Sequence, residues 1–259
     1  MRSKYLAAML IAAGLPAVTA AAEAEEGTSE ASKWSGDISV GLLFKRGNTD
    51  SDSVNAHANA SRDSAFWRHH FKADANNEKE RDPDTEQYNR TDENYFASYK
   101  LDRKLGEESR NYLFNVATYE KDNFSGFHYQ ASYAIGLGRR FIENDVHTLD
   151  MEAGPGYRVQ CLEPEDSYGD CANTEESAIA RLALKYHWQI SESAEFQEEI
   201  SSEVGEDSTS TRMETSLTSK INSHFALRLR HLLEHESKVP AGTKETDHQV
   251  TVGLVYTFK

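Results

Sequence analysis

Apolar and polar residues alternate along most of the chain after residue 34. Near the start of this region Ile38, Val40 and Leu42 alternate with polar or small residues, and Val250 and Val252 do so near the end. A period of two is typical of β-strands that have one apolar and one polar face. The pattern predicts about twelve strands, which begin near residues 34, 51, 66, 88, 110, 126, 146, 176, 194, 210, 224 and 247.

The connections between the predicted strands fall into two groups. Those after odd-numbered strands include the polar segments ERDPDTEQ and SKVPAGTKET, whereas those after even-numbered strands include the short turns IEND and NSH. Outer-membrane barrels have long loops at the extracellular end and short periplasmic turns. The chain therefore resembles an antiparallel transmembrane β-barrel, with both of its ends on the short-turn side. Pro155 cannot donate a ladder hydrogen bond, so we expect a bulge there.

Aromatic residues recur where the predicted strands meet the short-turn end. Such rings favour the level of the lipid headgroups, so they predict an aromatic girdle. The residues concerned are Trp34, Phe66, Trp67, Tyr99, Tyr112, Phe114, Phe141, Tyr186, Trp188, Phe196, Phe225, Tyr256 and Phe258.

The polar face of the strands carries many charged residues. A closed sheet of about twelve strands would not readily hold the large apolar side chains inside, so we expect them to face lipid and the charged face to line the lumen. The predicted lumen residues are Lys45, Arg68, Lys72, Asp74, Lys100, Asp150, Glu152, Arg158, Arg181, Lys185, Arg212, Glu214, Arg228 and Arg230. Basic residues outnumber acidic ones in this set, so a conducting lumen is expected to favour anionic solutes weakly.

The first 22 residues have the features of a cleaved secretory signal. Arg2 and Lys4 form a basic start, an apolar run follows from Tyr5 to Val18, and small residues precede position 23. We therefore assign residues 1–22 to a signal peptide, 23–33 to a flexible acidic leader and 34–259 to an outer-membrane β-barrel. An uncleaved N-terminal anchor is the alternative, but the apolar run is shorter than the span of about 20 residues that a bilayer requires.

Composition narrows the possible partners and the compartment. The formal net charge is −15, and it becomes −17 (26 − 43) without Arg2 and Lys4, which argues against nucleic acid. Mean hydropathy is −0.70, which a barrel tolerates because only alternate residues face lipid. Cys161 and Cys171 flank a short polar loop and predict a disulfide in an exported chain.

Catalytic and metal-binding patterns are weak in this sequence. His231, Glu234 and His235 match the H-x-x-E-H pattern of zinc peptidases, but that chemistry needs a helix. On the predicted strand the two histidines would lie about 13 Å apart, too far to share one zinc ion. If Ile221 pairs with Phe225, Thr215 lies opposite His231, and no serine completes a triad. We therefore expect no catalytic residues, no metal and no cofactor.

Several short motifs resemble those of a bacterial family. They are Trp34, Gly47-Asn48-Thr49, Asp122-Asn123-Phe124-Ser125-Gly126, Gly136-Leu137-Gly138 and Gly154-Pro155-Gly156-Tyr157-Arg158. In this order they resemble the salt-induced outer-membrane protein family, a bacterial domain of unknown function. The resemblance covers most of residues 34–259 and implies an outer-membrane barrel, with no catalytic residue to carry over.

The expected partners are outer-membrane lipid and the barrel-assembly machinery of a Gram-negative cell, which would read the closing strand HQVTVGLVYTF. The expected role is porin-like, either a narrow solute channel or a structural or envelope-stress protein. Two alternatives remain at this stage. One is an outer-membrane lipid hydrolase, and the other is a soluble periplasmic ligand-binding barrel with its apolar face inside.

Overall fold

A computed structural model describes residues 33–45, 50–82, 85–106, 109–162, 171, 173–239 and 243–258, with the side chains of Phe44 and Lys45 left out. The predicted signal peptide and nearly all of the predicted leader lie outside these residues, as do the Gly47-Asn48-Thr49 turn and Lys259. Residues 32–259 form one compact unit, which contains the whole barrel.

The described residues form twelve strands, as the alternation predicted. Each strand begins close to its expected position. The strands are β1 Ser35–Lys45, β2 Ser51–Asp63, β3 Trp67–Arg81, β4 Tyr88–Lys104, β5 Asn111–Asp122, β6 Phe127–Glu143, β7 His147–Leu162, β8 Thr174–Gln189, β9 Ala194–Gly205, β10 Thr209–Lys220, β11 Phe225–Glu236 and β12 Thr246–Phe258.

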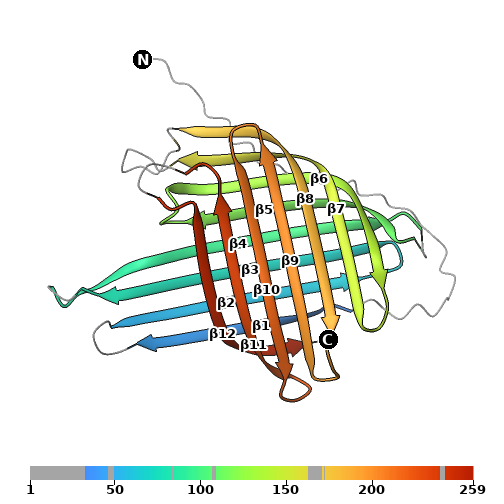
Figure 1. The fold of residues 1–259 in the computed structure, drawn as a ribbon, viewed down its shortest axis with the longest axis horizontal. Coiled ribbons are helices and arrows are strands. Elements are labelled where there is room, and N and C mark those ends of the chain that lie inside the picture. The colour runs from blue at the N-terminus through green and yellow to red at the C-terminus, as the bar shows by residue number, and fades with distance from the viewer. Residues whose placement is uncertain are drawn as a thin grey trace, which may run out of the picture. The chain divides into compact units, whose positions relative to one another are not determined.

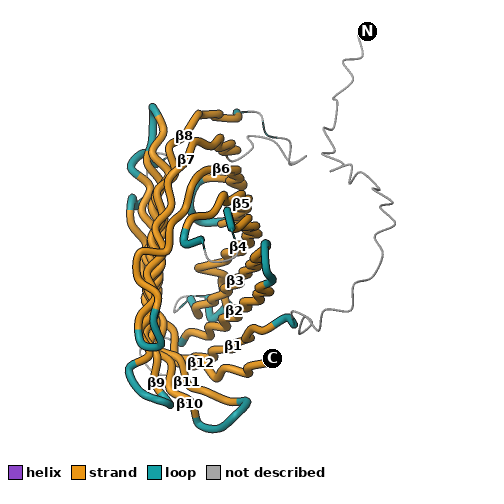
Figure 2. The backbone as a smooth tube through the Cα atoms, turned by 90° about the vertical axis from the view of Figure 1, so that its right-hand side faces the viewer, coloured by secondary structure: helices purple, strands orange, loops and turns teal. Residues whose placement is uncertain are grey.

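The twelve strands make one closed antiparallel sheet. Each strand pairs with the next along the chain, and the ring closes where β12 pairs with β1, from Gly36↔Phe258 to Val40↔Leu254. Figures 1 and 2 show this sheet curling back on itself. Closure gives every strand two partners, which removes the unpaired edges that an open sheet would expose. The β3–β4 hairpin projects beyond its neighbours at one end (Figure 1).

The distribution of side chains is the reverse of that in a soluble barrel. Large apolar residues on alternate strand positions face outward, and among them Leu137, Leu229 and Val252 are exposed by 60%, 48% and 64%. Polar and charged residues such as Asp102 and Arg158 are buried inside, with exposures of 0% and 2%. Among the residues described, no helix is long and apolar enough to cross a membrane.

Two predicted girdle aromatics point the other way. Tyr112 and Phe114 are 1% and 0% exposed and lie inside the barrel with Val116 and Ala134. The girdle assignment is therefore wrong for these two residues. Tyr112, Phe114 and Val116 form the more apolar side of this segment, opposite Asn111 and Asn115. The alternation therefore directs the two rings toward lipid, although they lie inside.

Glycines on β6 make room for these rings. A Cβ added at Gly136 would lie 2.8 Å from Cε1 of Phe114, and one at Gly138 would overlap the ring of Tyr112. The absence of a side chain at these two glycines lets the rings pack directly against the backbone of β6.

The expected bulge at Pro155 is also wrong. The ladder between β7 and β8 continues without a shift through Pro155↔Ala180. The shifts between β6 and β7 lie elsewhere, at Phe127/Tyr129 and Arg140/Ile142. On its other side, β7 pairs with β6 at Ala134↔Gly156 and again at Leu137↔Ala153 in the same register, with no pair between them. Pro155 lies in this gap, so the ladder needs no hydrogen-bond donor there.

Candidate functional site in the barrel lumen

Two cavities in the described part of the lumen share no lining residue. The outer cavity, of about 420 Å³, includes Asp92 and Asp247 near the long-loop end of the strands. The inner cavity, of about 470 Å³, includes Arg140 and Asp150 near the short-turn end. Each volume falls within the range of small-molecule pockets, roughly 300–1,000 Å³. The described part of the lumen is therefore neither fully packed nor a wide channel.

A layer of ion pairs lies between the two cavities. We call it the septum and define it as Lys72, Asp74, Arg212, Glu214 and Arg230. Asp74 and Arg230 line the outer cavity, and the other three line the inner cavity. Because these side chains come from β3, β10 and β11, they connect walls that are far apart in the strand order.

The septum contacts are short and largely buried. Lys72 Nζ lies 3.1 Å from Glu214 Oε2, and Arg212 Nη2 lies 2.9 Å from Asp74 Oδ2. Arg230 Nη2 bridges the two carboxylates, at 2.9 Å from Asp74 Oδ1 and 2.8 Å from Glu214 Oε2. Buried ion pairs persist only when each charge keeps a partner. The septum meets this condition with three cations and two carboxylates, and Glu199 lies 2.6 Å from Lys72.

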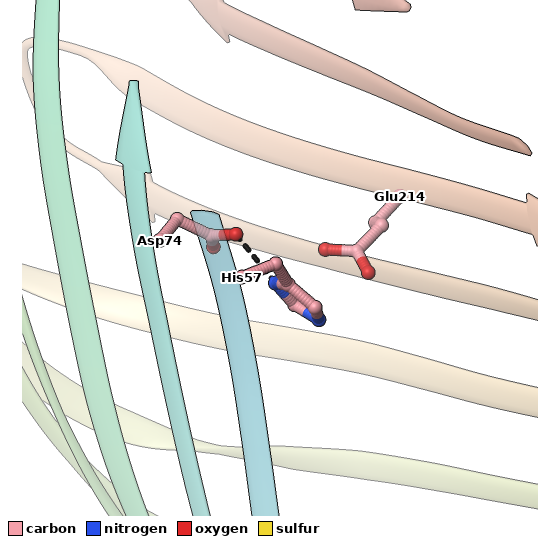
Figure 3. Close-up of side chains that lie close together, drawn as sticks. All are labelled: His57, Asp74 and Glu214. Carbon is pink, nitrogen blue, oxygen red and sulfur yellow. Dashed lines mark hydrogen bonds and ion pairs between the residues drawn. The ribbon is translucent and has the colours of Figure 1, made fainter. Parts of the chain in front are cut away.

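His57 joins the septum from β2. Its Nδ1 lies 2.5 Å from Asp74 Oδ1, and its Nε2 lies 2.7 Å from Asn59 Nδ2. Figure 3 shows His57 and Asp74 in contact, with Glu214 directed toward them from another strand. The ligand atoms of His57, Asp74 and Glu214 lie within 4.8 Å of one another, a spacing that could suit a metal ion.

The charges around this trio argue against a metal ion. Arg230 already contacts both carboxylates, while Arg212 and Lys72 each contact one. A divalent cation would have to displace or approach these groups, and like charges at such distances repel strongly in a partly buried setting. The trio is therefore better described as part of the ion-pair network.

A second cluster fills part of the inner end of the lumen. The hydroxyl of Tyr112 donates to Glu152 Oε1 at 2.9 Å, while Arg68 and Lys100 lie over the Tyr112 ring at 5.3 and 5.4 Å from its centroid. Lys100 also pairs with Asp102 at 3.3 Å. Cations over an aromatic face add attraction to the ion pairs.

Arg158 stabilises the part of the barrel wall near the end of β9. It is 2% exposed, and its guanidinium donates to the backbone carbonyls of Glu203 and Ser208 at 3.3 and 3.0 Å. Glu203 in turn accepts from Ser132 and from Arg181, at 2.7 and 3.0 Å. These contacts hold the end of β9 against β6, β7 and β8.

The structure places the predicted lumen residues on the inner wall, apart from Lys45, whose side chain lies outside the described atoms. Ten of them line the inner cavity, namely Arg68, Lys72, Lys100, Asp150, Glu152, Arg158, Arg181, Lys185, Arg212 and Glu214. Asp74, Arg228 and Arg230 line the outer cavity.

Many of the acids that neutralise these bases are absent from the lumen residues predicted from the sequence. Arg228 pairs with Asp37 at 2.5 Å, Lys185 with Glu199 at 2.5 Å, and Arg181 with Glu203 at 3.0 Å. The excess of basic side chains therefore disappears once both partners are included. The expected preference for anions loses its basis with it.

The H-x-x-E-H segment lies on β11, and its members divide between the two faces. Glu234 lines the outer cavity and pairs with Arg212. His231 lies opposite Thr215, in the register expected from the sequence. On the outer face the rings of His231 and His248 stack at 5.5 Å, and Thr215 Oγ1 donates to Glu198 Oε2 at 2.6 Å.

The disulfide expected from the sequence is present between Cys161 and Cys171, whose Cα atoms are 5.6 Å apart. Cys161 is the penultimate residue of β7 and is fully buried. The bridge ties the end of this strand to a residue that precedes β8.

A closed antiparallel sheet with an apolar outer wall and a charged interior is the architecture of a transmembrane β-barrel. The described residues fit that class in strand pairing and in the direction of their side chains. The chain belongs to the family described as protein of unknown function, DUF481, which matches residues 38–258.

Among known proteins, the uncharacterized protein YdiY of Escherichia coli (strain K12) is 28% identical over 231 residues, which cover 87% of this chain and 83% of that protein. The NanC porin has a TM-score of 0.48 and 9% identity, with 87% of this chain and 99% of that chain covered. The translocator domain of the autotransporter NalP from Neisseria meningitidis has a TM-score of 0.45 and 11% identity, with 87% of each chain covered.

Proposed function

We propose that this protein is an outer-membrane barrel that passes small polar solutes through a lumen constricted by the septum. The observation that carries the proposal is the pair of lumen cavities on either side of one layer of ion pairs. A barrel of twelve strands lies between eight-stranded barrels, which fill with side chains, and the porins of 16 or more strands, which leave an open channel.

The outer wall and the expected signal peptide support an outer-membrane location. A band of exposed Leu, Val and Tyr side chains is stable only against hydrocarbon, because in water it would drive association. Membrane fractionation and a heat-modifiability gel test the location. A folded, faster-migrating band in the outer-membrane fraction supports it, and recovery in the periplasmic fraction contradicts it.

Planar-bilayer recording tests the channel. The informative variant is K72M/E214Q, which removes one charge of each sign from the septum and leaves the net charge unchanged. The matched control, K79M/E80Q, makes the same change at exposed positions on β3. We expect small conductance steps from the wild type and from the control, and larger steps from K72M/E214Q.

The outcome that contradicts the proposal is equally clear. If neither the wild type nor correctly folded K72M/E214Q conducts, the lumen is not a solute path. A structural role for a sealed barrel would then account for the molecule better. Equal conductance in all three proteins would show that the septum does not constrict the path.

A further inference from the structure

The outer cavity differs from the inner cavity in how its acids are balanced. Asp92, Asp122, Glu234 and Asp247 all line it. Glu234 pairs with Arg212, but among the described residues no ion pair joins Asp92, Asp122 or Asp247 to a basic side chain. In the inner cavity, by contrast, Lys72, Lys185 and Arg181 each pair with an acid across or along the wall.

The basic side chains in the outer cavity do not offset this excess. Arg228 is engaged by Asp37, and Arg230 is engaged by Asp74 and Glu214. Lys244 is an exposed residue at the mouth. The outer cavity therefore has a negative field, and low-dielectric walls concentrate such a field on ions that enter.

Asn76 provides a second and independent observation. It lines the same cavity, is 8% exposed, and donates from Nδ2 to Asp92. Its Oδ1 has no hydrogen-bond partner in the described residues. A buried amide oxygen without a donor costs free energy, so Oδ1 is an acceptor that a donor entering the cavity would satisfy.

The spacing of the acids indicates the kind of cation. Among the described residues, only the trio His57, Asp74 and Glu214 brings three possible ligand atoms within 4.8 Å of one another. The carboxylates at the outer end are too dispersed to replace the water around a bare metal ion. Magnesium gives up its water reluctantly and is often held with several water molecules in place.

We propose that the outer cavity binds hydrated cations through Asp92, Asp122, Asp247 and Asn76, and that it thereby makes the lumen selective for cations. The selectivity rests on the proposed channel function, whereas the binding does not. Hydrogen bonds from the ion's water to the carboxylates and to Asn76 Oδ1 would hold the ion without direct coordination.

Isothermal titration calorimetry on the full barrel in detergent tests the binding. The probe is cobalt(III) hexaammine, an inert ion of the size and hydrogen-bonding character of a hydrated metal. The variant D92N/D247N removes two acids from the cavity, and the control D145N/E192Q removes two from short turns at the other end. We expect binding at least about tenfold weaker in D92N/D247N, which corresponds to about 1.4 kcal/mol. Equal affinity in all three proteins would overturn the site.

Zero-current potentials in a potassium chloride gradient test the selectivity. We expect the wild type and the control to favour potassium over chloride and D92N/D247N to lose much of that preference. Chloride preference in the wild type would overturn the inference while leaving the channel intact. If the wild type does not conduct, the proposed channel function is wrong. The calorimetry then still tests the binding site by itself.

Discussion

Lys72 on β3 lies 2.6 Å from Glu199 on β9, measured from Nζ to Oε2. These two strands are six positions apart in either direction around the ring. The contact therefore joins opposite walls of the barrel rather than neighbours in the sheet. Ion pairs of this kind hold the opposite walls together, so the lumen side chains contribute to the stability of the closed sheet.

Substitution of Lys72 should weaken the barrel. In K72M the carboxylates of Glu199 and Glu214 lose one cation, although Lys185 and Arg230 remain beside them. Breaking a buried pair costs roughly 3–5 kcal/mol. Because Lys185 and Arg230 still neutralise the two carboxylates, we expect K72M to lose about 3 kcal/mol or less of unfolding free energy. Urea unfolding in detergent measures the change. The control K79M, at an exposed position on the same strand, should shift the midpoint little.

The packing of Tyr112 against Gly138 predicts a second effect. In G138A the new methyl group would overlap a ring that is 1% exposed and fixed by Glu152. Overpacking of this kind destabilises by roughly 1–3 kcal/mol. The temperature at which the heat-modifiable band converts should fall.

The control is G253A, where the nearest atom, the carbonyl oxygen of Val40, would lie 3.3 Å from the new Cβ. That variant should lose less stability than G138A. If G138A unfolds at the wild-type temperature, the ring is not held against this wall.

A charge on the outer wall should be costly. Leu229 lies near the middle of β11 and is 48% exposed, whereas Leu105 lies in the short turn after β4 and is 51% exposed. In lipid, a lysine costs roughly 2–4 kcal/mol at the bilayer midplane and about 0–1 kcal/mol near the interface. The free energy of refolding into vesicles should therefore be less favourable for L229K than for L105K. Equal free energies for the two variants would mean that both positions share one environment and would contradict a lipid-facing wall.

Loss of the disulfide should weaken the barrel without abolishing it. The bridge between Cys161 and Cys171 closes a loop with a sequence separation of 10, and loop-closure entropy assigns such a bridge about 2–3 kcal/mol. We expect C161S/C171S to retain the folded band and to unfold at lower urea. Maleimide should label the wild type only after reduction. Labelling of unreduced, folded protein would show that the thiols are free.

The strands were predictable because alternation is a local property of the chain. A residue such as Leu229 faces the same side as Leu227 whatever its distant neighbours are, and the register of the β10–β11 hairpin followed from counting across a short turn. The basic residues of the lumen could be chosen on the same grounds.

The acids of the lumen and the inward rings were harder to assign. On β9 Glu199 lies on the face opposite Phe196 and Ile200, but Glu198 puts a carboxylate between those two apolar residues and obscures the alternation. On β5 Tyr112 and Phe114 lie on the more apolar face, opposite Asn111 and Asn115, so the alternation gives them the wrong direction. Contacts across the lumen depend on the reach of side chains between remote strands, which no local pattern records.

The contacts across the lumen join residues that are far apart in sequence. Lys72 and Glu199 are separated by 127 positions, and Asp37 and Arg228 by 191. A partly curled sheet would present each of these charges alone, either to water or to hydrocarbon, and hydrocarbon accepts a lone charge only at a high cost. The pairing of β1 with β12 and the neutralisation of the charges in the lumen therefore occur together. A half-assembled intermediate therefore gains little from entering the bilayer early.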